Sequence, residues 1–194
     1  MRCDKVDKSA FCEPPNNLSL LYYCDGDEKH WVKIQKSVGE FDSYSNEAVY
    51  KYFSKNYLIN TDEALKRIIF LVDKKTGVYI GTCSAWFEPK CDGFVPVLHW
   101  LAVRDGYENN GYARLLITET MKRFSQIYGD NVPVYLHTQP CSYKAIKLYS
   151  DFGFSVTKED TYSNAINECD EGLIELKKYM KPNVYRKIEQ SVVL

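Results

Sequence analysis

Residues 98–116, LHWLAVRDGYENNGYARLL, decide the fold. The stretch begins as a short apolar strand, passes through a tight polar loop and continues as an amphipathic helix. Gly111 and Ala113 flank Tyr112 where the helix is expected to begin. Because the residues at 111 and 113 are small, they leave the first backbone N–H groups of the helix accessible. Unpaired N–H donors and the positive end of the helix dipole coincide there and attract anions. The stretch therefore predicts a site for a phosphate-bearing molecule.

Two well-known phosphate-binding patterns do not fit this loop. A Walker A loop requires GxxxxGK[ST], and the sequence contains no such run. A dinucleotide-binding fingerprint requires GxGxxG after an early strand, and only one glycine of that kind is present. The other interpretation is that residues 108–113 hold the diphosphate of coenzyme A. Taken alone, the loop leaves open a purely structural role, because glycine is common at helix starts.

Size and composition indicate one ordinary globular domain. The chain has 194 residues, is 45% hydrophobic and has a net charge of −1, with both signs spread along it. This charge distribution gives no basic footprint for nucleic acid, and no apolar run reaches the roughly 20 residues that span a membrane. Because residues 1–17 lack an apolar core, we expect that they are not a secretory signal. The seven cysteines of the chain form no CxxC pair and follow no repeated spacing, which favours reduced thiols over disulfides or a zinc site. We expect a cytoplasmic protein without a metal, nucleic-acid or membrane partner.

Apolar periodicity and turn residues predict the remaining elements. We expect an irregular leader over residues 1–17, a domain over 18–180 and a tail over 181–194. The predicted strands are Leu18–Cys24, Arg67–Val72, Val78–Phe87, Pro96–Val103, Val132–Thr138, Phe154–Asp160 and Gly172–Tyr179. The predicted helices are Asp27–Val38, Asn46–Tyr57 with Ser45 as its N-cap, Gly111–Tyr128, and Cys141–Phe152 ending at Gly153. This order predicts a mixed α/β sheet with helices on both faces.

A second motif follows one strand and one helix after the loop. Residues 145–154, AIKLYSDFGF, match A-x-x-L-Y-x-x-x-G-F at every specified position. Residues 108–113, ENNGYA, match [Q/R]-x-x-G-x-[G/A] except at Glu108. With both motifs, the chain resembles the GNAT superfamily of acyl-CoA N-acyltransferases over roughly residues 18–179. The resemblance implies an α/β (α+β) GNAT fold, whose central mixed, mostly antiparallel sheet is splayed between two neighbouring strands.

The resemblance also implies a function. The chain is expected to move the acetyl group of acetyl-CoA to a primary amine of a small molecule or peptide, by direct attack in a ternary complex. Tyr149 takes the position of the family's general acid, and its phenol suits protonation of a thiolate. His99 lies four residues before Val103, on the same strand face as Leu101 and Val103, and an imidazole suits removal of the amine proton. The residues expected to bind coenzyme A are Leu101, Ala102, Val103, Glu108, Asn109, Asn110, Gly111, Tyr112, Ala113, Arg114, Ser142, Lys144 and Tyr149.

Two positions depart from the family pattern. Glu108 stands where Gln or Arg is usual, and a carboxylate about 4 Å from a phosphate costs about 1 kcal/mol in water-like surroundings. We expect a weakened or redirected contact there, with Arg104 and Arg114 close enough in sequence to compensate. Ser142 stands where many members place an Asn that bonds the pantetheine arm, and Ser reaches less far.

Several alternatives stay open at this point. His137 is a second candidate base, and Cys141, at a helix start, makes a covalent acyl-cysteine route conceivable. Tyr143 is a further candidate contact for the coenzyme. The acceptor pocket is expected near the first two helices and the loop after the hairpin, with candidates Trp31, Tyr44, Trp86 and Phe87.

Rival functions stay open as well. A non-catalytic acyl-CoA-sensing or partner-binding domain on the same fold is one rival, and Glu108 is its best support. An enzyme that uses a longer acyl donor is another. Dimers are common in the family, so a homodimer is also compatible with the resemblance.

Overall fold

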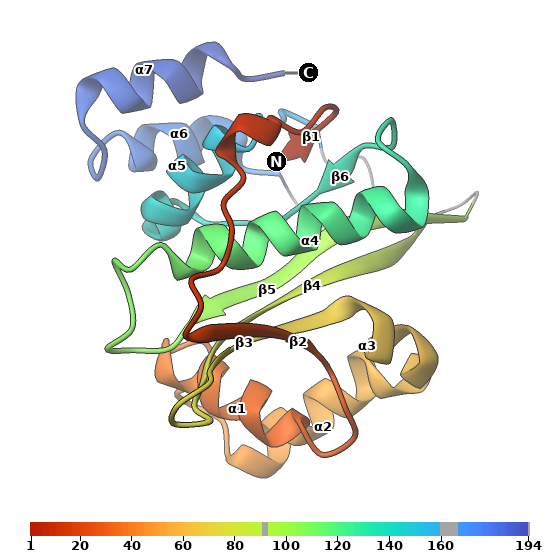
Figure 1. Cartoon of the computed structure of the whole chain (residues 1–194). Coiled ribbons are helices and arrows are strands. Elements are labelled where there is room, and N and C mark those ends of the chain that lie inside the picture. The colour runs from red at the N-terminus through yellow and green to blue at the C-terminus, as the bar shows by residue number, and fades with distance from the viewer. Residues whose placement is uncertain (91–92, 160–166, 194) are drawn as a thin grey trace. The chain divides into compact units, whose positions relative to one another are not determined.

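The computed structural model describes residues 1–90, 93–159 and 167–193 and has the predicted mixed α/β architecture (Figure 1). A central sheet has the strand order β1-β6-β5-β4-β3-β2. Its strands are β1 (Arg2–Cys3), β2 (Leu18–Tyr22), β3 (Ile68–Asp73), β4 (Tyr79–Lys90), β5 (Gly93–Val103) and β6 (Val134–Tyr135). The helices are α1 (Glu28–Ser37), α2 (Asn46–Asn56), α3 (Thr61–Arg67), α4 (Tyr112–Tyr128), α5 (Tyr143–Asp151), α6 (Cys169–Leu176) and α7 (Pro182–Gln190), with short 3-10 turns η1 (Lys8–Ala10), η2 (Leu58–Asn60) and η3 (Pro140–Ser142).

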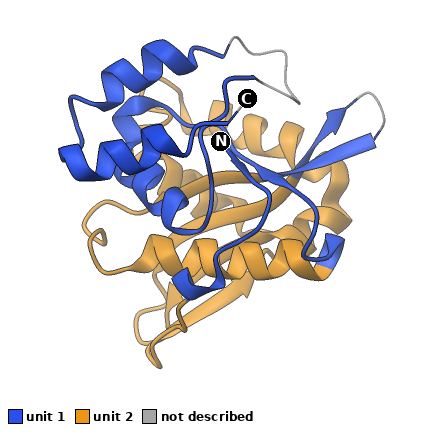
Figure 2. Ribbon diagram, turned by 90° about the horizontal axis from the view of Figure 1, so that it is seen from above, with its two compact units in different colours: residues 1–11, 87–97, 127–194 blue, residues 12–86, 98–126 orange. Residues whose placement is uncertain are grey.

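The chain divides into two compact units (Figure 2). Unit 2 comprises Cys12–Trp86 and Leu98–Gln126, which hold β2, β3, α1 to α3 and most of α4. Unit 1 comprises Met1–Phe11, Phe87–Val97 and Ile127–Leu194, which hold β1, β6 and α5 to α7. Strands β4 and β5 pass through both units.

Unit 2 is a three-layer arrangement around an antiparallel ladder. Strand β3 pairs with β2 from Leu18↔Asp73 to Tyr22↔Ile69 and pairs on its other edge with β4. The first five residues of β3 are all buried, as expected for a strand with both faces covered. Figure 1 shows α4 on one face of these strands and α1 to α3 on the other.

Gly81 in β4 sets how closely α4 approaches the sheet. A Cβ at this position would lie 2.9 Å from Leu116 Cδ1 of α4 and 2.7 Å from the backbone oxygen of Ala102. Both distances are shorter than real Cβ contacts, so only glycine fits without displacement. The glycine thereby brings the start of α4 close to the end of β5.

Local sequence signals explain the helix boundaries of unit 2. The Ser45 hydroxyl accepts a hydrogen bond from Ala48 N at 3.2 Å, which confirms it as the N-cap of α2. Helix α3 was not predicted. Its seven residues carry Ala64 and Arg67 as their only buried positions, so its apolar stripe is too short to show periodicity.

Unit 1 has a shorter ladder than the sequence predicts. Strand β1 pairs antiparallel with β6 through Arg2↔Tyr135 and Cys3↔Val134, although residues 1–17 read as irregular. Strand β6 pairs parallel with β5 at Val97↔Tyr135. Beyond this pair β5 continues to Val103, whereas β6 ends at Tyr135.

The two predicted C-terminal strands are wrong. Residues 172–179 were expected as a strand, but Cys169–Leu176 forms helix α6. Leu176 is buried with Ile146 and Ile188, and Leu173 packs against the same cluster, so the apolar residues follow the helical spacing of three. In the described part of 154–160 the pairing is limited to isolated bridges at Ser155 and Thr157. Residue 160 and the predicted loop that follows it lie mostly outside the described residues.

Among the described residues, no helix has both the length and the apolar character needed to cross a membrane.

Candidate active site

The loop that joins β5 to α4 has an unusual backbone. Its first residue, Arg104, donates its N–H to Ile80 O of β4 at 2.7 Å, which fixes the start of the loop to the sheet. Three residues then adopt positive φ: Gly106 (83°), Asn109 (63°) and Gly111 (79°). Left-handed residues reverse the chain in a short distance, and Gly and Asn are the residues that tolerate this conformation. These residues therefore allow the chain to turn sharply within the loop and to enter α4 at Tyr112.

Two side chains brace the loop from within. The Glu108 carboxylate accepts a hydrogen bond from Gly106 N at 2.9 Å. Asn110 Nδ2 donates to the backbone oxygens of Tyr107 and Glu108 at 3.1 and 3.0 Å. The carboxylate of Glu108 thus binds the backbone of its own loop. This is a redirected contact of the kind expected from the sequence at this position.

The start of α4 has the features of an anion site. At this end a backbone hydrogen bond runs from Leu115 N to Gly111 O at 3.2 Å, and the N–H groups of a helix's first turn point out of its start rather than to a carbonyl within the helix. The first turn contains no acidic residue. A Cβ at Gly111 would meet no atom within 4 Å, so there is free space beside this glycine. A diphosphate fits this chemistry.

Strand β5 contains one left-handed residue, Trp100, whose φ is +52°. This conformation is a genuine outlier for a bulky residue and breaks the alternation of side chains along the strand. As a result two consecutive side chains contact the same helical layer: His99 meets Tyr57, and Trp100 meets Trp31. The prediction that His99 shares a strand face with Leu101 and Val103 assumed regular alternation of side chains, and this alternation does not hold at Trp100.

His99 is half-buried and has a specific partner. Its Nδ1 lies 3.1 Å from the hydroxyl oxygen of Tyr57. The carbonyl oxygen of the next residue, Trp100, accepts a hydrogen bond from Gln35 Nε2 at 3.0 Å, and Gln35 is itself 1% exposed. The sequence contains no signal for Tyr57, Gln35 or the left-handed Trp100, since each depends on contacts between elements distant in the chain.

The second motif lies in unit 1, on α5 and the three residues that follow it. Tyr149 is buried at 6% exposure and packs its ring 5.8 Å from that of Phe154. Ser142 is half-buried just before α5, and Lys144 is exposed in its first turn. The structure thus places Ser142, Lys144 and Tyr149 together on one short segment, while His99 and residues 101–114 lie in unit 2.

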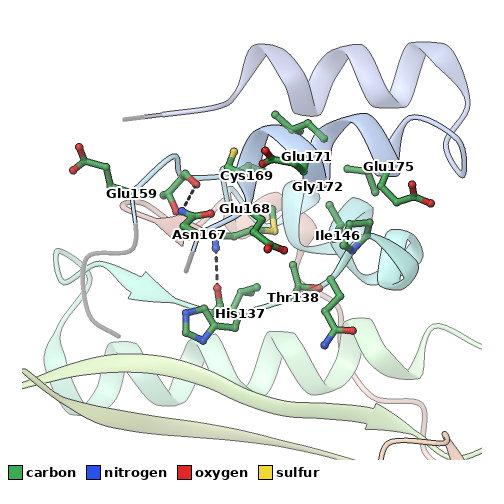
Figure 3. Close-up of a pocket in the computed structure, with 18 of the residues that line it drawn as sticks. His137, Thr138, Ile146, Glu159, Asn167, Glu168, Cys169, Glu171, Gly172 and Glu175 are labelled. Atoms are coloured by element: carbon green, nitrogen blue, oxygen red, sulfur yellow. Dashed lines mark hydrogen bonds between the residues drawn. The ribbon is translucent and has the colours of Figure 1, made fainter. Parts of the chain in front are cut away.

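Unit 1 also contains a cavity of about 730 Å³ (Figure 3). Its lining comes from β6 and the residues after it, from Ile146 of α5, and from α6. His137, the second candidate base, lines it together with Gln139. Four carboxylates also contribute to the lining: Glu159, Glu168, Glu171 and Glu175. Within the described residues, no group of three or more His, Cys, Asp or Glu side chains could hold a metal ion.

The remaining candidates are distributed differently from the expectation. Trp31 and Trp86 are buried at 0% and 4% exposure and belong to the core, whereas Tyr44 is 56% exposed. Phe87 lies in unit 1 and packs against Phe94 at 4.9 Å. Cys141 is exposed, with its sulfur 3.7 Å from Gln139 Oε1.

Comparison with known proteins agrees with this architecture. The family model described as "Acetyltransferase (GNAT) family" matches residues 31–154. Arabidopsis thaliana Naa50 in complex with the bisubstrate analogue CoA-Ac-MVNAL is similar in structure, with a TM-score of 0.55 and 21% identity over 78% of this chain and 91% of that one. The aminoglycoside N-acetyltransferase AAC(6')-Iy in complex with CoA has a TM-score of 0.55 and 17% identity over 80% of this chain and 96% of that one.

A GCN5-related N-acetyltransferase from Sphaerobacter thermophilus is 16% identical, with a TM-score of 0.49 over 64% of this chain, and the match spans 36% of that protein's length. No curated protein gives a significant match.

Proposed function

We propose that this chain, which belongs to the GNAT family of acetyltransferases, is an N-acetyltransferase that uses acetyl-CoA as its acyl donor. The acceptor in this proposal is a primary amine of a small molecule or peptide. Two similar proteins support this proposal. One is an aminoglycoside N-acetyltransferase in complex with CoA, and the other is Arabidopsis thaliana Naa50 in complex with the bisubstrate analogue CoA-Ac-MVNAL.

The observation that carries the proposal is the loop between β5 and α4. It turns through the left-handed residues Gly106, Asn109 and Gly111 into the start of α4, whose first turn has no acidic residue, and there is free space beside Gly111. In our proposal Asn109 to Arg114 hold the diphosphate of coenzyme A, and the backbone of Leu101 to Val103 binds the pantetheine arm. Ser142 and Lys144 are further proposed contacts of the coenzyme.

The proposed reaction is direct transfer between two bound substrates. The amine nitrogen attacks the carbonyl carbon of the thioester and forms the new C–N bond, and the C–S bond breaks. His99 takes the proton that the amine loses, and Tyr149 donates a proton to the departing thiolate. The products are an N-acetyl amide and coenzyme A with a free thiol, so no electron acceptor or metal is required by the balance.

Two measurements test this function together. Calorimetric titration should show acetyl-CoA binding with micromolar affinity, and a screen of amines, polyamines, amino acids, aminoglycosides and peptides should show acceptor-dependent thiol release. No binding of any acyl-CoA would overturn the proposal. Binding without thiol release from any acceptor would favour the acyl-CoA-sensing alternative.

A panel of acyl-CoA donors of increasing chain length completes the test. Faster thiol release from a longer acyl donor than from acetyl-CoA would identify a different acyltransferase on the same fold. Equal or slower release would support acetyl-CoA as the donor.

A further inference from the structure

Tyr57 is held rigidly at the end of α2. It is 0% exposed, and its backbone N–H donates to Phe53 O at 2.9 Å. Its ring lies 4.7 Å from that of Trp86 in a T-shaped arrangement and 5.0 Å from that of Phe53. Because packing fixes the ring on these sides, the position of its hydroxyl group is determined by the core of unit 2.

The hydroxyl group of Tyr57 meets His99. Tyr57 Oη lies 3.1 Å from His99 Nδ1, and the two rings are 5.9 Å apart at 66°. His99 is itself directed toward α2 by the left-handed Trp100, whose carbonyl the buried Gln35 holds. The surroundings of each residue therefore fix its position, and the contact between Tyr57 and His99 is already formed in the protein alone.

The direction of this hydrogen bond decides which nitrogen of His99 can accept a proton. A neutral imidazole carries its hydrogen on one ring nitrogen and a lone pair on the other, and a tyrosine hydroxyl can donate or accept. If Nδ1–H donates to Tyr57, the lone pair is on Nε2 and can take a proton. The imidazolium that then forms keeps the same hydrogen bond, now strengthened by charge. If Tyr57 donates instead, Nε2 carries the hydrogen and His99 is not a base.

We propose that Tyr57 is a positioning residue for His99: its hydroxyl oxygen accepts the hydrogen of Nδ1 and leaves Nε2 as the proton acceptor. The inference rests on the proposed function, in which His99 removes the proton of the attacking amine. Tyr57 itself need not touch either substrate. Its role resembles that of the third group in a catalytic triad, which orients the base.

Nitrogen NMR of the imidazole rings tests this directly. The chain has three histidines, so uniformly ¹⁵N-labelled protein gives few ring signals, and His99→Gln identifies those of His99. At a pH where His99 is neutral, the wild type should show Nδ1 protonated and Nε2 unprotonated. Tyr57→Phe should shift His99 toward the Nε2–H form, while His30 and His137 stay unchanged.

A matched control removes a different hydroxyl from the same helix. Tyr52 of α2 packs its ring against Trp31 and Trp100, so Tyr52→Phe perturbs the same aromatic cluster and should leave the His99 tautomer as it is. Protonated Nε2 in the wild type, or the same tautomer in wild type and Tyr57→Phe, would overturn the proposal. The wild-type result needs no variant, so it decides the hydrogen-bond direction even if Tyr57→Phe folds poorly.

Steady-state kinetics then separate this inference from the proposed function. Tyr57→Phe should lower kcat about tenfold, the size of effect typical of residues that orient a functional side chain, with an unchanged KM for acetyl-CoA. If His99→Gln leaves kcat unchanged while the NMR result holds, the base assignment is wrong and the hydrogen bond stands. If His99→Gln abolishes turnover but Tyr57→Phe alters neither tautomer nor kcat, only the role of Tyr57 is refuted.

Discussion

The carboxylate of Glu108 lies 2.9 Å from the backbone nitrogen of Gly106 and accepts its hydrogen bond. This contact closes the loop before α4 on itself. At this position the family pattern has Gln or Arg, so a carboxylate there suggests repulsion of the coenzyme's phosphates. In the structure the carboxylate instead accepts a hydrogen bond from the backbone of its own loop. The effect of Glu108 on coenzyme affinity distinguishes repulsion from this bracing contact.

Glu108→Gln should change the dissociation constant of acetyl-CoA by less than about threefold. A glutamine oxygen can still accept from Gly106 N, and the removed charge was already paired with a backbone donor. A carboxylate facing the diphosphate would cost about 1 kcal/mol, and its removal would tighten binding about fivefold. Calorimetric titration at constant ionic strength distinguishes these outcomes, and fivefold tightening would refute the bracing role.

Gly111→Ala should weaken acetyl-CoA binding. Gly111 has φ +79°, where an L side chain costs roughly 1–2 kcal/mol, and a methyl group would project into the open space before α4. The control is Gly77→Ala in the β3–β4 turn, where φ is +68° and a Cβ also meets no atom within 4 Å. Both variants should lose similar thermal stability, but only Gly111→Ala should raise the dissociation constant, by about tenfold. Equal binding by the two variants would contradict a ligand at this loop.

Tyr149→Phe should lower kcat by about 10- to 100-fold, because general acid catalysis typically contributes at least this much. Acetyl-CoA affinity should stay within about twofold, since the ring and its packing on Phe154 are kept. The control is Tyr185→Phe, which removes another buried hydroxyl of unit 1, one that donates to Glu189 at 3.1 Å. Thiol-release kinetics compare the two. Full turnover in Tyr149→Phe would remove this residue from the mechanism.

The cysteines should divide into reactive and protected groups. Burial raises the pKa of Cys3 and of Cys83 to about 12, whereas Cys24 and Cys141 are exposed. At pH 8 a maleimide should label Cys24 and Cys141 in the folded protein, and it should label Cys3 and Cys83 only after denaturation. Peptide mass spectrometry reads the sites. Rapid native labelling of Cys83 would show that the core of unit 2 opens.

The same two thiols make stability depend on alkaline pH. Unfolding returns each thiol to its ordinary pKa near 9, so above that pH the unfolded state loses protons that the folded state retains. Stability is therefore unaffected below about pH 9 by these groups and falls as the pH rises toward 12. Cys83→Ala should flatten part of this decline in urea-unfolding curves. An unchanged slope in that variant would contradict the burial of the thiol.

Elements with a strong local signal were predictable. The apolar run of β3, the N-cap Ser45 and the amphipathic α4 each depend on residues close together in the sequence. Strand β1 was not predictable, because two residues carry no periodicity and pair only with β6, more than a hundred residues later. A strand was predicted where α6 forms. Ile174 is exposed but apolar and lies between Leu173 and Leu176, so the apolar residues do not show a clear helical period in the sequence.

The sequence by itself determined the family, the order of the main elements from β2 to α5 and the position of the loop between β5 and α4. Each of these depends on short motifs and local periodicity, such as the glycine at 111 and the residues of 145–154. Only the tertiary structure decided where Glu108 directs its charge, that Trp100 is left-handed within β5, and that Tyr57 meets His99. The first two depend on left-handed backbone conformations, and the third depends on packing between segments that are distant in the chain. Neither a strained backbone nor a distant contact leaves a pattern in the local sequence.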